Sequence, residues 1–146
     1  MGIEVNKITS KEDFEAAFAI RREVFVDEQG VDANMEYDQF ESSASHFLAR
    51  LDGVPVGAAR WRVTSSGVKL ERFAVTKENR GKGIGQKLVK AVLEDIDSDP
   101  KMSKMKKYLH AQIKAVSLYT NFGFEKVGNI FEECNILHYQ MEMNNS

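Results

Sequence analysis

Apolar residues in the first third of the chain follow a strand pattern and then a helix pattern. Residues 3–8 alternate weakly between apolar and polar side chains, which predicts a strand. Thr9 or Ser10 can then cap a helix whose buried positions recur three and four residues apart. These positions are Phe14, Ala17, Phe18, Arg21, Val24 and Phe25, and the helix is predicted to end near Gly30.

The middle of the chain is predicted to hold an acidic loop followed by three strands. Residues 27–45 are polar and acidic and contain no Lys or Arg, so they predict a loop with one short helix at most. Residues 46–51, 54–63 and 68–75 have strand patterns separated by turn residues, which predicts an antiparallel meander. Strict alternation along the third strand places one set of side chains on a shared face: Lys69, Glu71, Phe73 and Val75.

The rest of the chain predicts a long amphipathic helix, a short helix and three more strands. Ile84, Leu88, Val92 and Ile96 lie four residues apart on one face of the long helix. Residues 108–112, 124–127 and 136–143 read as strands, and the short helix at 115–122 ends at Gly123. This order predicts one α/β (α+β) domain over residues 1–146, with a single mixed sheet of about six to seven strands flanked by helices.

Composition narrows the class of protein. The 146 residues carry a formal net charge of −2, which gives no global reason to expect nucleic-acid binding. Cys134 is the only cysteine, which excludes an intrachain disulfide and fits a reducing compartment. No secretory signal and no apolar run long enough for a bilayer is found, so we expect a cytoplasmic protein without membrane partners. His and Cys are too few and too scattered to predict a metal site.

The most informative stretch runs from Leu70 to Gly85, where a strand passes through a glycine-rich loop into a helix. A helix start carries unpaired N–H groups and partial positive charge, and glycines let the backbone approach a ligand. The glycines at 81, 83 and 85, with Arg80 before them and Lys82 between the first two, therefore predict a binding site for a phosphate or pyrophosphate. Gln86 stands where the dinucleotide fingerprint needs its third glycine, and no P-loop ending occurs, so both motifs are excluded.

Two segments resemble the signatures of the GNAT N-acetyltransferases. Arg80-x-x-Gly83-x-Gly85 resembles their acyl-CoA loop, and Tyr119-x-x-x-Gly123-Phe124 resembles their second signature. Residues 22–31, 36–38, 44–46 and 133–138 resemble the bacterial ElaA/YjcF-like subgroup. That subgroup usually has Gly-Ile-Pro-His where this chain has Asn135-Ile136-Leu137-His138, and Asn can replace Gly where the backbone needs a positive φ.

The resemblance implies a transferase, an acyl-CoA-dependent N-acyltransferase that moves an acetyl group from acetyl-CoA to a small-molecule or peptide amine. It implies direct attack in a ternary complex, oxyanion donors at about Phe73 to Val75, and Tyr119 as the general acid for the departing thiolate. The cofactor-binding residues that it implies are Phe73, Ala74, Val75, Arg80, Gly81, Lys82, Gly83, Ile84, Gly85, Gln86 and Tyr119.

Three residues are candidates for the base that takes the proton of the acceptor amine. Glu71 lies beside Phe73 and Val75, whose apolar surroundings would raise its pKa; alternatively it pairs with Arg60, Arg62 or a lysine. His46 and His138 match the subgroup pattern and fall near strand ends from which both would reach one cleft; alternatively both are structural. A further histidine, His110, is expected to be structural.

Several alternatives stay open. The acyl donor could be another acyl-CoA, such as succinyl-CoA, or the chain could be a non-catalytic module that binds or senses CoA. The acidic segment 27–45 would either recruit a cationic amine or remain solvated. The pattern does not identify the acceptor amine or the oligomeric state, for which a homodimer is one option.

Overall fold

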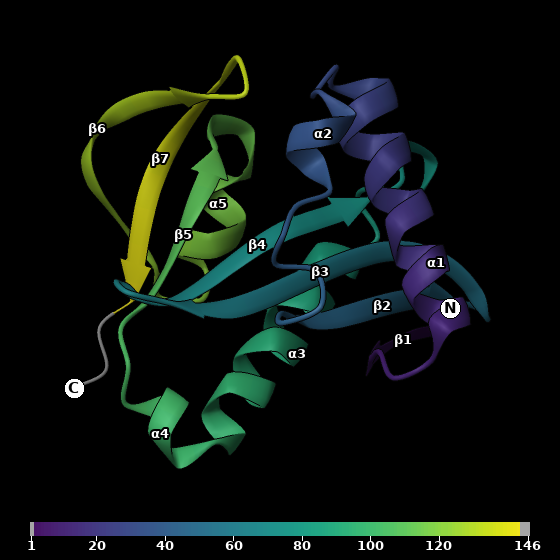
Figure 1. Cartoon of the computed structure of the whole chain (residues 1–146), viewed down its shortest axis with the longest axis horizontal. Coiled ribbons are helices and arrows are strands. Elements are labelled where there is room, and N and C mark those ends of the chain that lie inside the picture. Colours follow the sequence, from purple (N-terminus) through teal and green to yellow (C-terminus); the bar gives the residue numbers. More distant parts are fainter. Residues whose placement is uncertain (1, 144–146) are drawn as a thin grey trace.

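A computed structural model describes residues 2–143, which form one seven-stranded sheet with helices on both faces (Figure 1). The strands are β1 (Ile3–Lys7), β2 (Ser45–Leu51), β3 (Val54–Thr64), β4 (Gly67–Val75), β5 (Lys107–Gln112), β6 (Glu125–Glu133) and β7 (Ile136–Met143). The helices are α1 (Lys11–Arg21), α2 (Ala33–Glu36), α3 (Ile84–Ser98), α4 (Pro100–Ser103) and α5 (Val116–Thr120), and a π-helical segment (Arg22–Glu28) continues α1. The predicted α/β (α+β) class is confirmed. Within residues 2–143, no helix combines the length and the apolar character that crossing a bilayer requires.

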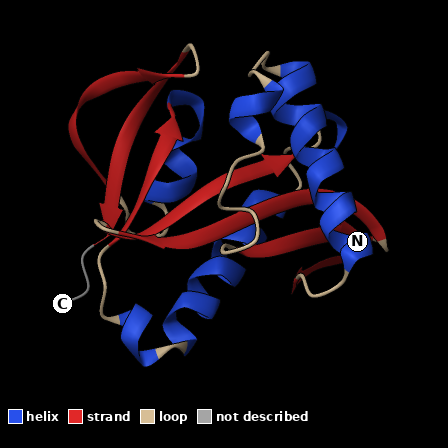
Figure 2. Ribbon diagram, in the orientation of Figure 1, coloured by secondary structure: helices blue, strands red, loops and turns tan. Residues whose placement is uncertain are grey.

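The sheet opens between its two parallel strands. The strand order is β1-β2-β3-β4-β5-β7-β6, and only β4 and β5 run parallel to each other. These two strands pair only over Val68–Leu70 and Lys107–Leu109, and beyond them they separate (Figure 2). In the described chain, the part of β4 after Leu70 therefore has a strand partner only on its β3 side.

The two faces of the sheet pack against different helices. Helix α3 covers one face and places a row of apolar side chains against it: Ile84, Leu88, Val89, Val92 and Ile96. Helix α1 covers the other face through Ala17 and Ile20 (Figure 1). Gly57 on β3 allows α3 to lie close, because a Cβ there would stand 3.1 Å from the Leu88 side chain. Close packing of this kind fixes the start of α3 relative to the end of β4.

A bulge in β4 overturns the predicted faces of this strand. Glu71 pairs with Arg60 and Ala74 pairs with Ala58, so Arg72 and Phe73 together oppose a single residue of β3. Arg72 has a φ of 60°, the left-handed conformation that bulges use. The extra residue reverses the alternation of side chains after Glu71. Glu71 therefore faces α1, whereas Phe73 and Val75 face α3. The prediction that these three side chains share a face is wrong, because alternation does not continue through a bulge.

Other differences from the predicted elements are local. Strand β6 continues to Glu133 instead of ending at residue 127, because its pairing with β7 resumes at Phe131 after an irregular stretch. Helix α4 lies in the predicted polar connector, where the Asp99 side chain accepts hydrogen bonds from the first N–H groups of the helix. Asn135 has a φ of 64°, which confirms the positive φ predicted for it.

Candidate functional site

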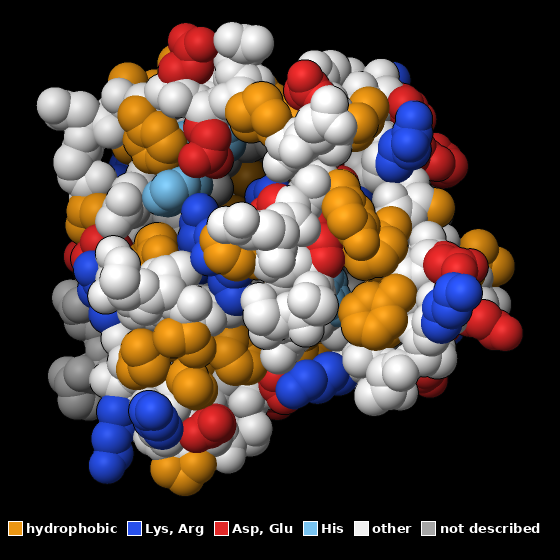
Figure 3. All heavy atoms as spheres, in the orientation of Figure 1, with side chains coloured by type: hydrophobic (Ala, Val, Ile, Leu, Met, Phe, Trp, Pro, Cys, Tyr) orange, Lys and Arg blue, Asp and Glu red, His pale blue; other side chains and the backbone are white. Residues whose placement is uncertain are grey.

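A cavity of about 400 Å³ lies in the opening between β4 and β5. In Figure 3 a hollow in the surface lies between the β6–β7 hairpin and α2. The cavity reaches both faces of the sheet. Its α3 side is formed by Phe73, Val75, Gly85, Leu118 and Tyr119. Its α1 side is formed by Lys69, Glu71, His110, Gln112 and His138, together with residues of the segment 24–36.

The start of α3 lies beside the cavity and leaves backbone donors without a partner in the helix. The Lys87 N–H donates to the Gly83 carbonyl at 3.2 Å and closes the first turn of the helix. The N–H groups of Ile84, Gly85 and Gln86 thus have no partner within the helix. Gly83 precedes them with a φ of +88°, and a Cβ there would meet no heavy atom within 4 Å. This open, donor-rich backbone fits a phosphate group.

The two cationic side chains of the loop have protein partners. Arg80 donates to both carboxylate oxygens of Glu28, at 2.6 and 2.7 Å, and its Nε donates to the Val75 carbonyl at 3.0 Å. The hydrogen bond from Arg80 lowers the pKa of Glu28. Lys82 donates to Asn79 at 3.1 Å. Arg80 therefore ties the loop to the end of the π-helical segment, and its contact with a pyrophosphate stays a prediction.

The predicted cofactor-binding residues fall into two groups. Phe73, Ala74, Val75, Arg80, Gly85 and Tyr119 line the cavity. The others, Gly81, Lys82, Gly83, Ile84 and Gln86, belong to the loop and the first turn of α3 outside that lining. The Ile84 side chain is part of the core, so only its backbone is available to a ligand.

Tyr119 presents a hydroxyl group without a protein partner. Its ring packs edge-on against Phe73 and Phe124, with ring centroids 5.7 and 6.2 Å away. Burial raises the pKa of Tyr119, which keeps the hydroxyl protonated at neutral pH. Within residues 2–143 no hydrogen bond is made by this hydroxyl, although Tyr119 lines the cavity. The packing fixes the ring, and the proton remains available to a ligand.

Glu71 lies in a network of ion pairs instead of an apolar pocket. Its carboxylate is 2.7 Å from Arg60 and 2.7 Å from Arg62, and Lys69 lies at 3.5 Å. Burial acts to raise the pKa of Glu71, but the positive charges of Arg60 and Arg72 lower it below its ordinary value. The predicted apolar setting and raised pKa are wrong, and pairing with Arg60, Arg62 and a lysine is confirmed. A carboxylate held in this way is a poor proton acceptor.

The acidic segment supplies the other carboxylates of this network. Arg21 pairs with Glu36 and Glu41 at 2.8 and 2.7 Å, and Arg60 pairs with Asp38 at 2.6 Å. Arg21 and Arg60 are both fully buried. Glu36 and Glu41 are therefore buried and Asp38 is half-buried, and none of the three is free to recruit a cationic amine, because the arginines of the sheet and α1 already neutralise them.

The network predicts a pH dependence of stability that Asp38→Asn should remove in part. Burial acts to raise the pKa of Asp38, but the hydrogen bonds from Arg60 lower it to about 2, against about 3.9 for an unfolded chain. Its stabilising effect is fully present above about pH 4 and is lost as the pH falls toward about 2. Urea unfolding at several pH values should show the difference between wild type and Asp38→Asn shrinking toward low pH. Asp27→Asn, on the exposed surface, is the control, and a difference for Asp38→Asn that is constant with pH would contradict the expectation.

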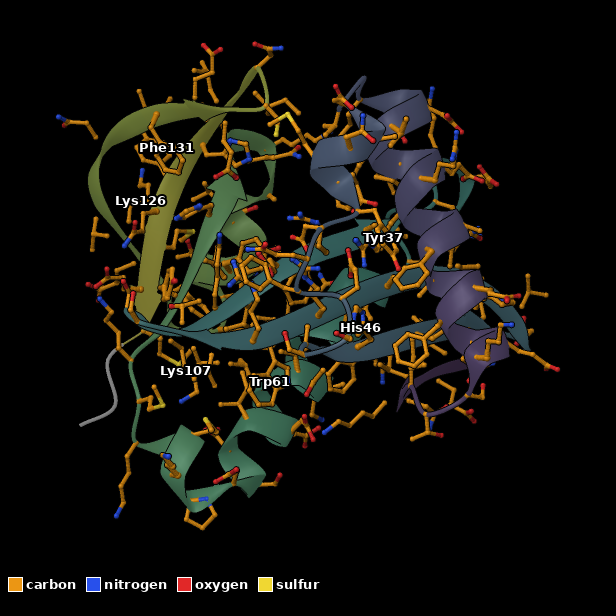
Figure 4. The ribbon with its side chains drawn as sticks, viewed as in Figure 1. Tyr37, His46, Trp61, Lys107, Lys126 and Phe131 are labelled. Carbon is orange, nitrogen blue, oxygen red and sulfur yellow. The ribbon has the colours of Figure 1, made fainter. Side chains whose placement is uncertain are left out.

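His46 lies away from the cavity. It is only 3% exposed, its Nε2 donates to the Glu41 carbonyl at 2.7 Å, and Phe14 and Phe18 pack edge-on against its ring. Burial lowers the pKa of His46. Figure 4 shows it beneath α1, far from Phe131, on which His138 stacks. The prediction that His46 and His138 reach one cleft is wrong, because β2 and β7 lie on opposite sides of the opening in the sheet.

Two histidines line the cavity from β5 and β7. His138 Nδ1 donates to the Ile136 carbonyl at 2.7 Å, and its ring stacks on Phe131 with centroids 5.7 Å apart. His110 Nδ1 lies 3.2 Å from a carboxylate oxygen of Glu133. His110 is predicted to be structural, and Gln112 and Glu133 are not among the predicted site residues, although all three line the cavity. Alternation along 108–112 puts His110 and Gln112 on one face, but only the separation of β4 and β5 exposes that face.

Cys134 also lines the cavity, at the turn between β6 and β7. Burial, followed by the charge of Glu133, raises the pKa of its thiol, which disfavours the thiolate that a nucleophile requires. Across the described part of the chain, no group of three or more His, Cys, Asp and Glu side chains is placed to hold a metal ion.

Comparison with known proteins identifies the family. A model of the acetyltransferase (GNAT) domain matches residues 7–145. The N-acetyltransferase YjcF of Bacillus subtilis (strain 168) is 38% identical over 133 residues, which cover 90% of this chain and 93% of YjcF. The crystal structure of Escherichia coli ElaA matches with a TM-score of 0.86 at 26% identity and covers 98% of this chain and 100% of that chain. A GNAT family acetyltransferase from Elizabethkingia anophelis with acetyl-CoA bound shares the fold, with a TM-score of 0.72, 15% identity and 98% coverage of both chains. The chain belongs to the GNAT acetyltransferase family, as an acyl-CoA-dependent N-acyltransferase similar to YjcF and ElaA.

Proposed function

We propose that this chain transfers an acetyl group from acetyl-CoA to the amino group of a small molecule or peptide, by direct attack in a ternary complex. The observation that carries this proposal is the cavity between β4 and β5, which joins the α3 side to the α1 side. An acyl donor and an amine that enter from opposite faces of the sheet would meet there. Holding both in one site makes their reaction effectively intramolecular.

The α3 side fits a coenzyme A thioester. The free N–H groups of Ile84, Gly85 and Gln86 suit a pyrophosphate, and Gly83 leaves the approach to them open. The unpaired edge of β4 after Leu70 offers backbone groups to an extended amide-containing arm such as pantetheine. When bound, acetyl-CoA supplies an acetyl group activated as a thioester. Backbone N–H groups at Phe73 to Val75 would stabilise negative charge on the reacting oxygen if the thioester binds along this edge.

Tyr119 is suited to protonate the departing sulfur. Its hydroxyl stays protonated at neutral pH because burial raises its pKa. The packing against Phe73 and Phe124 holds the ring in one orientation, so the donor is positioned before the reaction begins.

The α1 side is suited to the amine. The amine must lose a proton, because only its neutral form attacks, and a cavity imidazole can accept that proton. Of the three predicted base candidates, Glu71 is held by arginines and His46 lies outside the cavity. His138 is the remaining candidate. It lines the cavity, and because Nδ1 donates to the Ile136 carbonyl, Nε2 faces no such contact.

A transfer assay tests the proposal. The chain is incubated with acetyl-CoA and a panel of polyamines, amino acids, amino sugars and short peptides, and both the free CoA thiol and the acetylated product are measured. We expect CoA release that depends on one class of amine and a matching N-acetyl product. Faster transfer from succinyl-CoA would contradict the donor assignment. Binding of acetyl-CoA without turnover on any amine would favour a non-catalytic CoA-sensing module instead.

A further inference from the structure

His110, on β5, is held in the cavity by two side chains of β6. Its Nδ1 lies 3.2 Å from Glu133 Oε2 on β6, and its ring packs edge-on against Phe131, with centroids 5.0 Å apart. A carboxylate only accepts hydrogen bonds, so this contact places the imidazole proton on Nδ1 and leaves Nε2 for a ligand. His110 directly follows Leu109, the last residue of β5 that pairs with β4. It therefore lies at the narrow end of the opening, where the strands begin to separate.

Glu133 differs from the other carboxylates of the cavity. Glu36 and Glu71 are both paired with arginines, whereas Glu133 has His110 as its one ion-pair partner within residues 2–143. The hydrogen bond from His110 lowers the pKa of Glu133 to about 2, so the carboxylate is ionised at neutral pH. An ionised carboxylate on Nδ1 orients an imidazole and stabilises the imidazolium that forms when Nε2 takes a proton.

His138 has a different environment. Its Nδ1 donates to a neutral backbone carbonyl, and the residue is only 6% exposed. A proton on Nε2 of His138 would create a buried positive charge. Within residues 2–143 His138 forms no ion pair, and its charge lowers the pKa of Glu133 less than His110 does. The two imidazoles share Phe131 as a neighbour and line the same cavity, but only His110 has the partner that suits a proton acceptor.

We propose that His110 is the base that takes the proton from the acceptor amine, and that Glu133 is the residue that positions His110. This rests on the proposed acetyl transfer. In the step, an N–H bond of the acceptor ammonium breaks, the Nε2–H bond of His110 forms, and the amine keeps the electron pair with which it attacks. Glu133 balances the charge of the imidazolium, which then returns the proton to water. His138 shapes the wall of the cavity through its stacking on Phe131.

Other charged and titratable groups surround His110, and any pH profile will report on all of them together. On the α1 side of the cavity they are Lys69, Glu71 and Arg72 from β4, Glu36 from α2, Glu133 and Cys134 from β6 and its turn, and His138 from β7. Tyr108 lies outside the cavity lining, and its ring contacts the His110 ring. Single-residue variants are therefore needed to assign a change in the pH dependence of kcat/KM to one group.

The test compares wild type with five variants, and measures kcat/KM over a range of pH for an amine that wild type acetylates. His110→Gln should lower kcat/KM by about 10²-fold and remove the acidic limb of the profile. Added imidazole should restore part of the activity of His110→Ala. Glu133→Gln should move the acidic limb to lower pH, because the imidazolium loses its counter-charge. Glu132→Gln is the matched control, since its side chain is exposed outside the cavity. It should change neither kcat/KM nor the position of the acidic limb. His138→Gln should leave the limb in place.

Two results would overturn the proposal. One is an acidic limb that disappears in His138→Gln but persists in His110→Gln; the other is a kcat/KM of His110→Gln within about threefold of wild type. NMR titration of the imidazoles tests the pair without any turnover, so it separates this proposal from the proposed function. Glu133→Gln should shift the titration midpoint of His110 to lower pH by more than that of His138. Equal shifts, or none, would contradict a positioning role for Glu133.

Discussion

Gly83→Glu should abolish measurable binding of acetyl-CoA, while Gly53→Glu should leave it unchanged. The glutamate would add a side chain and a negative charge directly before the N–H groups of Ile84, Gly85 and Gln86, where the pyrophosphate is expected to lie. Calorimetry should show wild-type binding in the micromolar range, about −8 kcal/mol. For Gly83→Glu we expect the affinity for acetyl-CoA to fall by at least about 10²-fold. The glutamate side chain would occupy the phosphate site, and its negative charge would repel the phosphate.

The Gly53 variant controls for backbone strain. Gly53 has a φ of +86° against +88° for Gly83, and at both positions an added Cβ would meet nothing within 4 Å. Both substitutions therefore force a side chain into a left-handed conformation at similar cost, but Gly53 lies in the β2–β3 turn outside the cavity. Equal losses of acetyl-CoA affinity in the two variants would mean that backbone strain, and not a blocked phosphate site, explains the result. Undiminished affinity in a folded Gly83→Glu protein would refute the binding site.

The features that the sequence predicted correctly depend on local signals. The glycine-rich start of α3, the cap at Ser10 and the positive φ of Asn135 each follow from a few neighbouring residues whose backbone requirements are specific. The apolar periodicity of α3 likewise specifies both the helix and its buried face. The succession of the strands and main helices along the chain agrees with the prediction, whereas the order of the strands in the sheet was not predicted.

The features that were missed depend on contacts between distant residues. The bulge at Arg72 changes the facing of everything after it, yet nothing in the alternation of 68–75 marks the inserted residue. Arg60 pairs with Glu41, 19 positions earlier in the chain. Glu36 and Glu41 are therefore buried by their arginine partners, whereas Asp27, Glu28 and Asp32 of the same acidic segment are exposed. His110 enters the site only because β5 separates from β4, and single-strand patterns do not reveal such a separation.

Tyr119→Phe should lower kcat by about 10²-fold or more while acetyl-CoA affinity stays within about twofold of wild type. Phenylalanine keeps the ring and its edge-on contacts with Phe73 and Phe124 but removes the proton that the departing sulfur requires. Steady-state kinetics with saturating amine gives kcat, and calorimetry gives the affinity for acetyl-CoA. The free energy of unfolding should change by no more than about 1 kcal/mol, because the lost hydroxyl leaves no protein hydrogen bond broken.

Tyr108→Phe is the matched control for this prediction. Tyr108 is 8% exposed and Tyr119 is 6% exposed, so both substitutions remove a hydroxyl from a buried ring. The Tyr108 hydroxyl, however, is 2.6 Å from Thr64 Oγ1 and does not line the cavity. Loss of that hydrogen bond should lower stability by about 1 kcal/mol and leave kcat unchanged. The two variants should thus show opposite effects: Tyr119→Phe impairs catalysis with little change in stability, and Tyr108→Phe does the reverse. If kcat of Tyr119→Phe stays within about threefold of wild type, the hydroxyl is not the general acid and Tyr119 serves only to pack the core.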